Sequence, residues 1–336
     1  MIKAAIVAVP ETAGSALYGM VDVLSAAGSV WQNLMRTETD GPAFDVRVVA
    51  LGHRPFQCGY RVPVQPDHAI SDDYVPDIVI LPEIWLGPDE RVAGRHPGLS
   101  DWVRTCHERG AWVYAACAGT VLLAETGLLD GCEATSHWGY EDLFRRCYPK
   151  VQFKPDPPLV FADREGRVVT AGGTTSWHDL ALHIIARHAS PGEALRIAKV
   201  YLLKLHVEGQ LPYRELLRGH AHADAAVRAC QASMEANFTA HAARTTAVAQ
   251  SGLAERTLKR RFKQATGITP IDYLQNLRIE QAKRILETTR TPVEEIGPMV
   301  GYEDTSFFRR LFKRKTGLTA GAYRRMFRDD VAGIRR

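Results

Sequence analysis

The last third of the chain contains the same ten-residue pattern twice, fifty positions apart. Residues 258–267 align with residues 308–317, and a shared tyrosine follows each copy, at Tyr273 and Tyr323. A pattern that recurs at a fixed offset indicates one structural unit used twice. Each copy predicts a helix that ends at a glycine, with apolar residues facing a core and Lys and Arg on the opposite face. The positions identical in both copies are Arg260/Arg310, Phe262/Phe312, Lys263/Lys313, Thr266/Thr316, Gly267/Gly317 and Thr269/Thr319.

A shorter predicted helix and a glycine turn precede each basic helix. These are residues 246–251 with Gly252, and residues 292–300 with Gly301. A short helix, a glycine turn and a basic second helix form the helix-turn-helix layout, in which the second helix lies in the major groove of DNA. The repeat therefore predicts an all-α domain with two helix-turn-helix units.

Residues 271–288 predict a long helix that joins the two units. Its apolar residues fall on one stripe, so this helix can hold both units rigidly on one side of a duplex. The stripe consists of Leu274, Leu277, Ala282, Ile285 and Leu286. Residues 291–294 then predict a capping box, with Pro292 at the first position of the next helix.

Charge is distributed unevenly along the chain. Residues 1–217 hold 20 Lys and Arg against 26 Asp and Glu, a net charge of −6, whereas residues 218–336 hold 22 against 12, a net charge of +10. This asymmetry predicts that one domain meets a polyanion and the other does not. The alternative is a solvated basic face, and the repetition of the whole unit argues against it.

Several short motifs lie in and around the repeat, namely Ser251-Gly252-Leu253, Arg256-Thr257-Leu258, Gly267-Ile268-Thr269-Pro270, Tyr273-Leu274, Val300-Gly301-Tyr302 and Phe308. Through them, residues 224–328 resemble the AraC/XylS regulators, which implies double-stranded DNA as a partner. The chain departs from the family pattern at Gly297-Pro298. Because Pro298 lacks a backbone N–H, we expect the first helix of the second unit to be kinked or shortened. The two helix-turn-helix units are then expected to bind DNA unequally. The expected DNA-contacting residues are Arg256, Lys259, Arg260, Lys263, Thr305, Ser306, Arg309, Arg310 and Lys313.

The first part of the chain alternates between apolar, β-branched runs and helical patterns. Such alternation predicts a doubly wound α/β fold with a mostly parallel sheet. The expected strands are residues 2–9, 44–51, 77–81, 112–116, 133–136 and 168–171, with a hairpin at 161–168. The expected helices are residues 15–27, 99–109, 119–127, 138–147, 174–188 and 191–207.

Cys117 stands where a buried strand is expected to pass into a helix, with Ala116 before it and Ala118-Gly119 after it. Small neighbours permit a tight strand-to-helix elbow. A thiol at a helix amino terminus is favoured as the thiolate, which is its nucleophilic form. The simpler interpretation is a small buried residue at a sharp turn, because catalysis also needs a positioned base and an oxyanion hole.

The elbow at Cys117 is followed by residues 122–131, 134–138 and 170–176 in an order and spacing that resemble the class I glutamine-amidotransferase-like, PfpI-type domain. The resemblance implies a flavodoxin-like sensor domain over residues 1–208, with His137 as the partner of Cys117. Two departures argue against catalysis. The matching stretch of the first helix, at residues 15–18, carries no acidic residue to face the thiol. The stretch after the third strand has no glycines to supply oxyanion N–H groups, and Pro82 in it has no N–H.

A PfpI-type domain followed by an AraC-type domain is similar to the GlxA-like transcriptional regulators. This resemblance implies a catalytically inactive domain that reports on a metabolite, a homodimer on repeated DNA sites, and activation of transcription, with RNA polymerase as a candidate partner. Residues 209–223 are the predicted linker. We expect His220 and His222 to be polar linker residues, because no Cys or acidic partner lies at metal-ligand spacing.

The six cysteines form neither a Cys-x-x-Cys pair nor a regular spacing. The spacing indicates neither a zinc site nor a disulfide framework. We therefore expect no metal and no cofactor, and we expect the protein to lie in a reducing cytoplasm. The longest uncharged apolar stretch, residues 111–124, is shorter than the ~20 residues that span a bilayer. Residues 1–9 are interpreted as a first strand and not as a signal segment.

An effector pocket is expected at the carboxyl edge of the sheet. Its candidate residues are Glu83, Trp85, Cys117, His137 and Trp138. A carboxylate beside two indoles suits a cation, which predicts an amino-acid-like or quaternary-ammonium effector. The alternative is that both tryptophans cap the core while Glu83 is solvated. Two other functions also stay open: a PfpI-type cysteine hydrolase or hydratase fused to a DNA-binding domain, and a redox sensor at Cys117.

Overall fold

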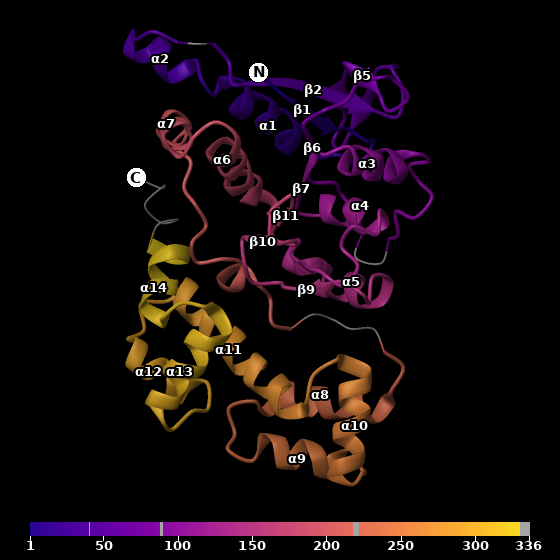
Figure 1. The fold of residues 1–336 in the computed structure, drawn as a ribbon. Helices are drawn as coiled ribbons and strands as arrows, with labels where there is room; N and C mark the ends of the chain where they lie inside the picture. Colours follow the sequence, from indigo (N-terminus) through magenta and orange to yellow (C-terminus); the bar gives the residue numbers. More distant parts are fainter. Residues whose placement is uncertain (40, 88–89, 218–221, 330–336) are drawn as a thin grey trace. The chain divides into compact units, whose positions relative to one another are not determined.

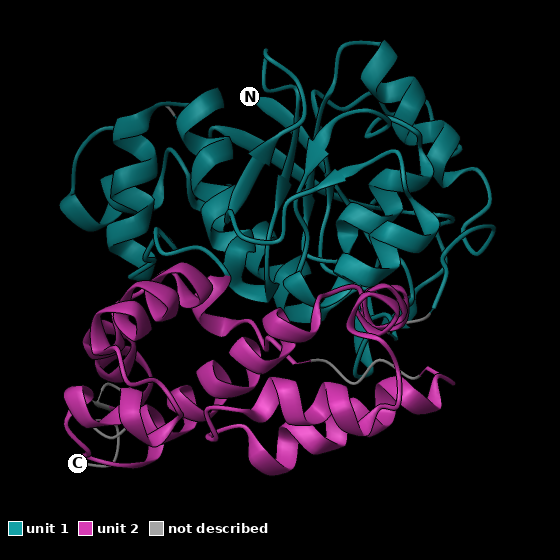
Figure 2. Cartoon of the chain, turned by 90° about the horizontal axis from the view of Figure 1, so that it is seen from below, with its two compact units in different colours: residues 1–210 teal, residues 211–336 magenta. Residues whose placement is uncertain are grey.

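The computed structural model describes residues 1–39, 41–87, 90–217 and 222–329 of the chain. The chain divides into two compact units, the amino-terminal unit of residues 1–210 and the carboxyl-terminal unit of residues 211–336 (Figure 2). The predicted linker, residues 209–223, begins in the first unit and continues into the second, and His220 lies outside the described residues.

A seven-stranded sheet, counted over the described residues, forms the centre of the amino-terminal unit (Figure 1). Its order is β10-β11-β7-β6-β1-β2-β5, and every neighbouring pair is parallel except β10 and β11. The strands are β1 (Ile2–Val7), β2 (Phe44–Ala50), β5 (His68–Ala69), β6 (Ile78–Leu81), β7 (Trp112–Ala116), β10 (Leu159–Phe161) and β11 (Val168–Ala171). This order is doubly wound, which confirms the predicted fold class. The predicted hairpin is also present, as β10 and β11.

Helices cover both faces of this sheet, because its strands are apolar on both sides. Ile78 and Ile80 of β6 face one core, and Val79 and Leu81 face the other. The first core is covered by α1 (Gly14–Ala26), α6 (Trp177–His188) and α7 (Pro191–Tyr201), and the second by α3 (Leu99–Glu108), α4 (Gly119–Glu125) and α5 (Glu141–Cys147) (Figure 1).

Some predicted elements are shorter than expected. The helix predicted at 191–207 ends at Tyr201, because Leu202 adopts a left-handed backbone with φ of 54°. The helix predicted at 174–188 begins as the 3₁₀ turn η2 (Thr174–Ser176), and the one predicted at 138–147 begins as η1 (Trp138–Tyr140). The strand predicted at 133–136 is only β8 (Glu133–Ala134), which pairs with β9 (Gln152–Phe153) outside the main sheet. The prediction missed α2 (Val30–Met35), β5, β9 and the hairpin of β3 (Phe56–Cys58) and β4 (Val62–Val64).

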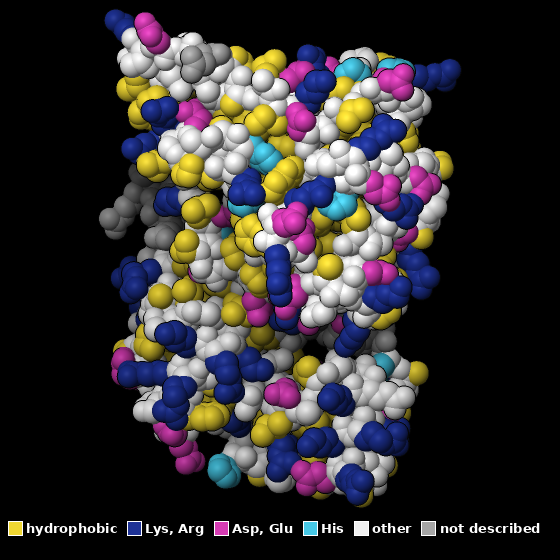
Figure 3. All heavy atoms as spheres, viewed as in Figure 1, with side chains coloured by type: hydrophobic (Ala, Val, Ile, Leu, Met, Phe, Trp, Pro, Cys, Tyr) yellow, Lys and Arg dark blue, Asp and Glu magenta, His cyan; other side chains and the backbone are white. Residues whose placement is uncertain are grey.

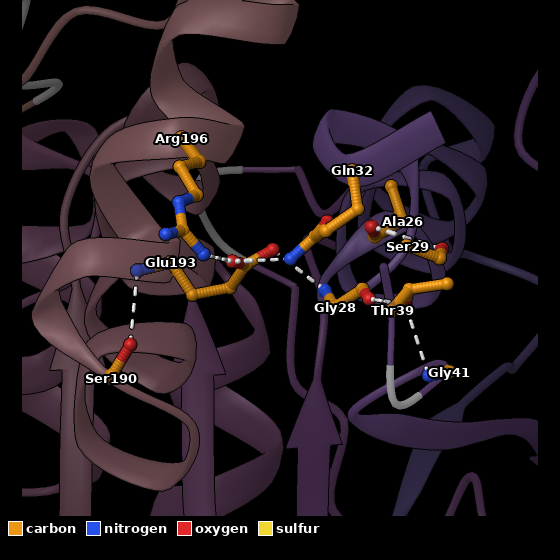
Figure 4. A network of polar contacts seen from close by, with 9 residues as sticks. All are labelled: Ala26, Gly28, Ser29, Gln32, Thr39, Gly41, Ser190, Glu193 and Arg196. Carbon is orange, nitrogen blue, oxygen red and sulfur yellow. Dashed lines mark hydrogen bonds and ion pairs between the residues drawn. The ribbon is translucent and has the colours of Figure 1, made fainter. Parts of the chain in front are cut away.

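A polar network closes the amino edge of the sheet, the edge opposite to Cys117 (Figure 4). Glu193 is buried in the first turn of α7, where it accepts hydrogen bonds from Gly28 N at 2.7 Å and from Gln32 Nε2 at 3.4 Å. Arg196 forms an ion pair with the same carboxylate at 3.2 Å. Glu193 therefore ties α7 to the turn between α1 and α2, and it stabilises the scaffold far from the elbow.

The elements of the carboxyl-terminal unit are all helices within its described residues, and they show the repeat in detail (Figure 1). Its elements are η3 (Leu211–Tyr213), α8 (Ala225–Asn237), α9 (Ala243–Gln250), α10 (Glu255–Thr266), α11 (Pro270–Thr288), α12 (Val293–Met299), α13 (Thr305–Thr316), α14 (Ala320–Arg324) and η4 (Arg325–Asp329). Gly267 and Gly317 end α10 and α13 in left-handed conformations, with φ of 79° and 75°. The next helices begin at the side-chain caps Thr269 and Thr319. The predicted glycine-terminated repeat is thus confirmed.

The cores of the two helix-turn-helix units repeat the same contact. Phe262 packs edge-on against Tyr273 with ring centroids 5.4 Å apart, and Phe312 packs against Tyr323 at 5.6 Å. The tyrosine hydroxyl then donates to a glutamate on the preceding long helix, Glu235 of α8 in the first unit and Glu287 of α11 in the second. In the second unit, α11 therefore takes the part that α8 takes in the first.

The predicted capping box at residues 291–294 is wrong. Pro292 is the N-cap of α12 and not its first helical residue, and no side chain caps this helix. The hydroxyl of Thr291 is instead 3.0 Å from that of Thr289. Pro298 lies inside α12, which ends one residue later, at Met299. Because it has no N–H, Pro298 cannot donate the hydrogen bond to the carbonyl four residues earlier, that of Glu294.

Candidate functional site

The two basic helices present polar faces opposite their buried ones. In α10, Leu258, Phe262 and Thr266 are buried, and in α13 the same positions plus Leu311 are buried. The predicted DNA-contacting side chains are exposed, except for Thr305, which is half-buried. Lys and Arg side chains are dense over the helical unit on the face in Figure 3. This placement gives each helix one face in a core and one basic face exposed to solvent.

An ion pair joins the two helices of each helix-turn-helix unit, with the charges exchanged between the units. In the first unit Arg244 of α9 pairs with Glu255 of α10. In the second unit Glu294 of α12 pairs with Arg309 of α13 at 2.9 Å. A further basic residue of α10, Arg261, forms two hydrogen bonds to Asp224, the cap of α8, at 2.7 and 2.8 Å. Arg261 therefore fixes α10 to its own unit.

Arg278, which the sequence analysis did not single out, connects the two helix-turn-helix units. This buried residue of α11 donates to Phe238 O at 2.7 Å and to Ala240 O at 3.1 Å, both just beyond α8. Its guanidinium also lies over the ring of Tyr302 at 4.9 Å, next to the turn glycine of the second unit. Any side chain at Gly301 would come within 3.0 Å of this guanidinium. Arg278 thus helps to fix the spacing between α10 and α13.

In the amino-terminal unit, Cys117 forms the predicted elbow between β7 and α4. Its backbone is left-handed, with φ of 52°, a strained conformation for a residue other than glycine. The turn is tight because Gly119 packs against β6, where a Cβ would lie 2.2 Å from Leu81 O. Ser136 Oγ holds the elbow from the other side by donating to Cys117 O at 2.6 Å.

A carboxylate reaches the thiol from an unexpected element. Cys117 Sγ donates to Glu83 Oε1 at 3.4 Å, and Thr174 Oγ1 donates to the same oxygen at 2.9 Å. Glu83 and Cys117 are each 2% exposed. The acidic neighbour that is absent from the first helix is thus supplied by the loop after β6.

This environment keeps the sulfur protonated. Burial and the neighbouring Glu83 raise the pKa of Cys117 well above its ordinary value. Burial likewise raises the pKa of Glu83 itself. The thiolate expected at the elbow is therefore wrong, because desolvation outweighs the favourable field of the helix terminus.

Backbone donors near the thiol are used for structure. Trp85 N donates to Glu11 O at 2.7 Å, and Ala13 N donates to Glu83 O at 2.8 Å. These bonds, with a bridge between Thr12 and Ile84, hold the loop after β1 against the loop after β6. Because Pro82 has no N–H, this stretch supplies little with which to bind an oxyanion.

The aromatic candidates fall into two groups. The rings of His137 and Trp138 contact each other at a tilt of 32°, with centroids 4.8 Å apart, and His137 Nδ1 accepts from Gly139 N at 2.9 Å. Trp85 is 45% exposed and packs edge-on against Tyr60 at 5.7 Å. The structure thus brings Glu83 to Cys117, and His137 to Trp138, while Trp85 contacts another loop.

Gln210 is a second residue that sequence reasoning missed. It is 5% exposed, and its Nε2 donates to Ser136 O at 3.0 Å and to Thr135 Oγ1 at 3.3 Å. Its Oε1 accepts from Trp138 N at 3.1 Å. A lone glutamine in a predicted linker carries no pattern, so only the folded chain identifies it as part of this site.

A separate pocket of about 400 Å³ opens at the carboxyl ends of β1 and β2. It is lined by Ala8, Pro10, Ala50, Leu51, Gly52, His53, Arg54 and Phe56. In the sheet order, β6 lies between β1, at this pocket, and β7, which leads into the elbow. The carboxyl edge therefore offers a hollow beside the buried Glu83 and Cys117 cluster.

Comparison with known proteins agrees with this geometry. Residues 11–187, more than half of the chain, match the DJ-1/PfpI family. The chain belongs to the DJ-1/PfpI family. Residues 247–326 match a helix-turn-helix domain. The predicted combination of a DJ-1/PfpI domain with an AraC-type helix-turn-helix domain is confirmed.

The similar curated proteins are transcriptional regulators. The HTH-type transcriptional regulator CdhR of Pseudomonas aeruginosa is 27% identical over 221 residues, which cover 65% of this chain but only 64% of CdhR, just under two thirds of its length. The regulator GlxA of Rhizobium meliloti is 26% identical over 226 residues, covering 66% of this chain and 68% of that protein. A crystal structure of a putative transcriptional regulator from Vibrio parahaemolyticus, 19% identical with a TM-score of 0.50, covers 60% of this chain and 99% of that one, and it supports the fold alone.

Two kinds of feature are absent from the described residues. None of the helices there combines the length and apolar character needed to cross a membrane. No cluster of three or more His, Cys, Asp or Glu side chains within that part of the chain is arranged to hold a metal ion. Of the two histidines in the predicted linker, His222 is described, and its Nε2 lies 2.9 Å from Gln231 Oε1.

Proposed function

We propose that this protein is a transcriptional regulator that binds a specific DNA site through both helix-turn-helix units and responds to a small molecule bound by its DJ-1/PfpI domain. The observation that carries the proposal is the pair of repeated basic helices, held at a fixed spacing by α11 and Arg278. The names of the curated relatives support the same class of function. A homodimer acting on cytoplasmic promoter DNA, with RNA polymerase as a partner in activation, belongs to this proposal.

The DNA contacts are proposed to come from the exposed faces of α10 and α13. The residues are Arg256, Lys259, Arg260 and Lys263 of the first helix, and Thr305, Ser306, Arg309, Arg310 and Lys313 of the second. An arginine that reads guanine bidentately contributes about 1–3 kcal/mol of discrimination, whereas a phosphate contact lowers affinity for all sequences alike.

The test is to select a duplex from a random library with the full chain and measure its affinity for variants. Arg260→Ala combined with Arg310→Ala should weaken binding, while Arg164→Ala, an exposed arginine of the other unit, is the matched control. Unchanged affinity of the double variant would sink the assignment.

For the effector, we propose a cation that approaches Glu83, with His137, Trp138 and Trp85 as aromatic neighbours. Glu83 Oε2 is buried and forms no hydrogen bond within the described residues, so it can accept from an ammonium donor. A cation beside this carboxylate would lower its raised pKa, so binding should release a proton and strengthen as the pH rises through that pKa.

Calorimetric titration of the full chain with cationic amino acids and quaternary ammonium compounds, in buffers of different ionisation enthalpy, tests both points. Glu83→Gln should abolish the proton release. A neutral or anionic metabolite that binds while every cation is silent would refute this pocket chemistry.

Catalysis at Cys117 is not part of the proposed function, because its sulfur is buried, protonated and short of oxyanion donors. The same burial opposes a peroxide sensor, since oxidation needs an accessible thiolate. Cys117→Ala separates the three functions. We expect DNA binding and ligand response to persist in this variant, whereas loss of a turnover or of a peroxide response would restore one of the alternatives.

A further inference from the structure

Gln210 is the last residue of the amino-terminal unit, and hydrogen bonds fix it beside the proposed effector site. We call this fixed point the first anchor. Gln210 N donates to Asp156 O at 2.8 Å, and the Gln210 side chain bonds both to Ser136 and to Trp138. The fit is close, because a Cβ at Gly172 would lie 2.4 Å from Gln210 Nε2. Any ligand that moves the loop of His137 and Trp138 must therefore move or release this side chain.

A second anchor lies a few residues further along the chain, on α11. Leu216 N donates to Glu280 Oε1 at 2.7 Å, and Asn276 Nδ2 donates to Leu216 O at 3.1 Å. Lys283 Nζ donates to Arg214 O at 2.9 Å and lies 3.2 Å from both oxygens of Glu280. All three of these α11 side chains are buried. A buried ion pair needs such extra hydrogen bonds to offset its desolvation, so the backbone of residues 214–216 completes it.

The docked segment also contributes one side chain to each helix-turn-helix core. Leu216 packs into the core of the second unit, which contains Phe312. Leu217 packs into the core of the first unit, which contains Phe262. Two consecutive residues, Leu216 and Leu217, thus pack against the cores of the two helix-turn-helix units, next to α11, the helix that joins these units.

Little slack separates the two anchors. Gln210 and Leu216 are six positions apart, which limits even a fully extended segment to about 20 Å. The segment is shorter than that, because η3 (Leu211–Tyr213) is a helical turn and Tyr213 packs against Phe327 at 5.4 Å. Only residues 211–213 therefore lie between Gln210 and the second anchor, which begins at Arg214.

We propose that residues 211–217 form a strap that transmits the state of the effector site to the DNA-binding helices, with Gln210 as the residue that reads the site. When the loop of His137 and Trp138 rearranges, Gln210 pulls or releases the strap. The strap then shifts Leu216 and Leu217 in the two cores and changes the spacing of α10 and α13. The physiological role of this relay rests on the proposed function, but the mechanical coupling does not.

Hydrogen exchange of the full chain, followed by mass spectrometry, tests the coupling without any effector. Gln210→Ala should speed exchange in residues 213–217 and in α11 by roughly fivefold, because one anchor of the strap is lost. Gln152→Ala removes a side-chain hydrogen bond to Gly131 O in the same unit and should leave these peptides unchanged. Lys283→Met breaks the other anchor and should speed exchange in the same peptides directly.

An insertion distinguishes a strap from general destabilisation. Adding Gly-Gly-Ser between Gln210 and Leu211 supplies slack, so Gln210→Ala should no longer affect residues 213–217 in this background. The coupling is refuted if Gln210→Ala leaves the exchange of these residues as in the parent chain, or if its effect survives the insertion. A second variant, Gln210→Met, keeps the length of the side chain and removes its donors and its acceptor without adding a buried charge.

The affinity of the selected duplex is measured on the same proteins. Gln210→Ala should change it severalfold, and the insertion should cancel that change. Failure of the parent chain to select any duplex would overturn the proposed function alone, since the exchange result still decides the strap.

Discussion

The two helix-turn-helix units share a core but differ at their surfaces. Phe262 with Tyr273, and Phe312 with Tyr323, make nearly the same contact in both. At the surface, Arg244 neutralises Glu255 in the first unit, whereas Glu294 engages Arg309 in the second. The core is thus the conserved part of this internal duplication, and the surfaces give the two units different electrostatic properties.

The difference suggests unequal grip on DNA. In α10, none of Arg256, Lys259, Arg260 and Lys263 forms an ion pair within the described residues. In α13, Arg309 is paired and the amino terminus carries Asp304, whose carboxylate caps the helix. Among the side chains proposed to contact DNA, the first unit therefore has four basic residues without an ion pair within the described residues, and the second has two, Arg310 and Lys313. Contacts to phosphates dominate affinity for DNA, so this difference favours the first unit. The sequence had pointed to unequal grip through Pro298, but the surface charges give a stronger reason.

The largest effects should come from the shared cores. Phe262→Ala and Phe312→Ala should each lower the free energy of unfolding by about 3–5 kcal/mol, because each ring is fully buried. Denaturation followed by far-ultraviolet circular dichroism measures this loss. Tryptophan fluorescence follows the unfolding of the amino-terminal unit alone, since all six tryptophans precede residue 211. It therefore serves as an internal control that both substitutions should leave unchanged. Two losses that differ by several kcal/mol would show that the cores are not equivalent.

A smaller effect should separate the two surfaces that are proposed to contact DNA. Replacing Lys259, Arg260 and Lys263 by Ala should weaken binding roughly fivefold more than replacing Arg309, Arg310 and Lys313, because Arg309 is already paired. Both sets remove three positive charges, so each is the control for the other. Fluorescence anisotropy across a salt series measures the affinities and their salt slopes. Equal losses, or a larger loss from the second set, would reverse the proposed order of grip.

The helix caps provide a third and weaker contrast. Asp304 accepts from Ser306 N and Phe307 N at the start of α13, whereas Ala254 caps α10 without a side-chain bond. Asp304→Ala should lower the free energy of unfolding by about 1 kcal/mol, and Ala254→Asp should raise it by a similar amount. Thermal unfolding followed by circular dichroism measures both changes in stability. If Ala254→Asp is neutral, the first unit is already stabilised elsewhere.

Periodicity made much of the fold predictable from the sequence. The strands of the sheet and the helices of the repeat are defined by local patterns of apolar residues and by glycines such as Gly267 and Gly317. The errors lie where tertiary contacts override local pattern. Leu202 ends α7 in a left-handed conformation, and Pro292 acts as an N-cap despite its capping-box sequence.

The chemistry of the sites was less predictable, because it depends on residues far apart in the chain. Glu83 approaches Cys117 across 34 positions, and the protonated state of the sulfur follows from burial, which the sequence does not display. Arg278 and Lys283 look like exposed helix residues by composition, yet each is buried against backbone carbonyls. Elbow and repeat motifs thus locate the sites, and only long-range packing shows what the sites can do.

The smallest expected effect concerns an ion pair that only the first unit has. Arg261 forms two hydrogen bonds to Asp224 and lowers the pKa of that carboxyl, whereas the equivalent position in the second unit is the buried Leu311. A carboxyl whose pKa is lower in the folded state stabilises the fold above its unfolded pKa of about 3.8, and this contribution is lost as the pH falls through the folded value. The melting temperature of the parent chain should therefore exceed that of Asp224→Asn at pH 7, and the gap should close below about pH 3.8. Asp304→Asn is the control for the cap at the second unit, since an asparagine still accepts from the backbone there. No gap between the parent chain and Asp224→Asn at pH 7 would mean that the cap, which asparagine preserves, stabilises the first unit and that the charge does not. A gap that stays constant from pH 7 to pH 3 would contradict an origin in the ionisation of Asp224.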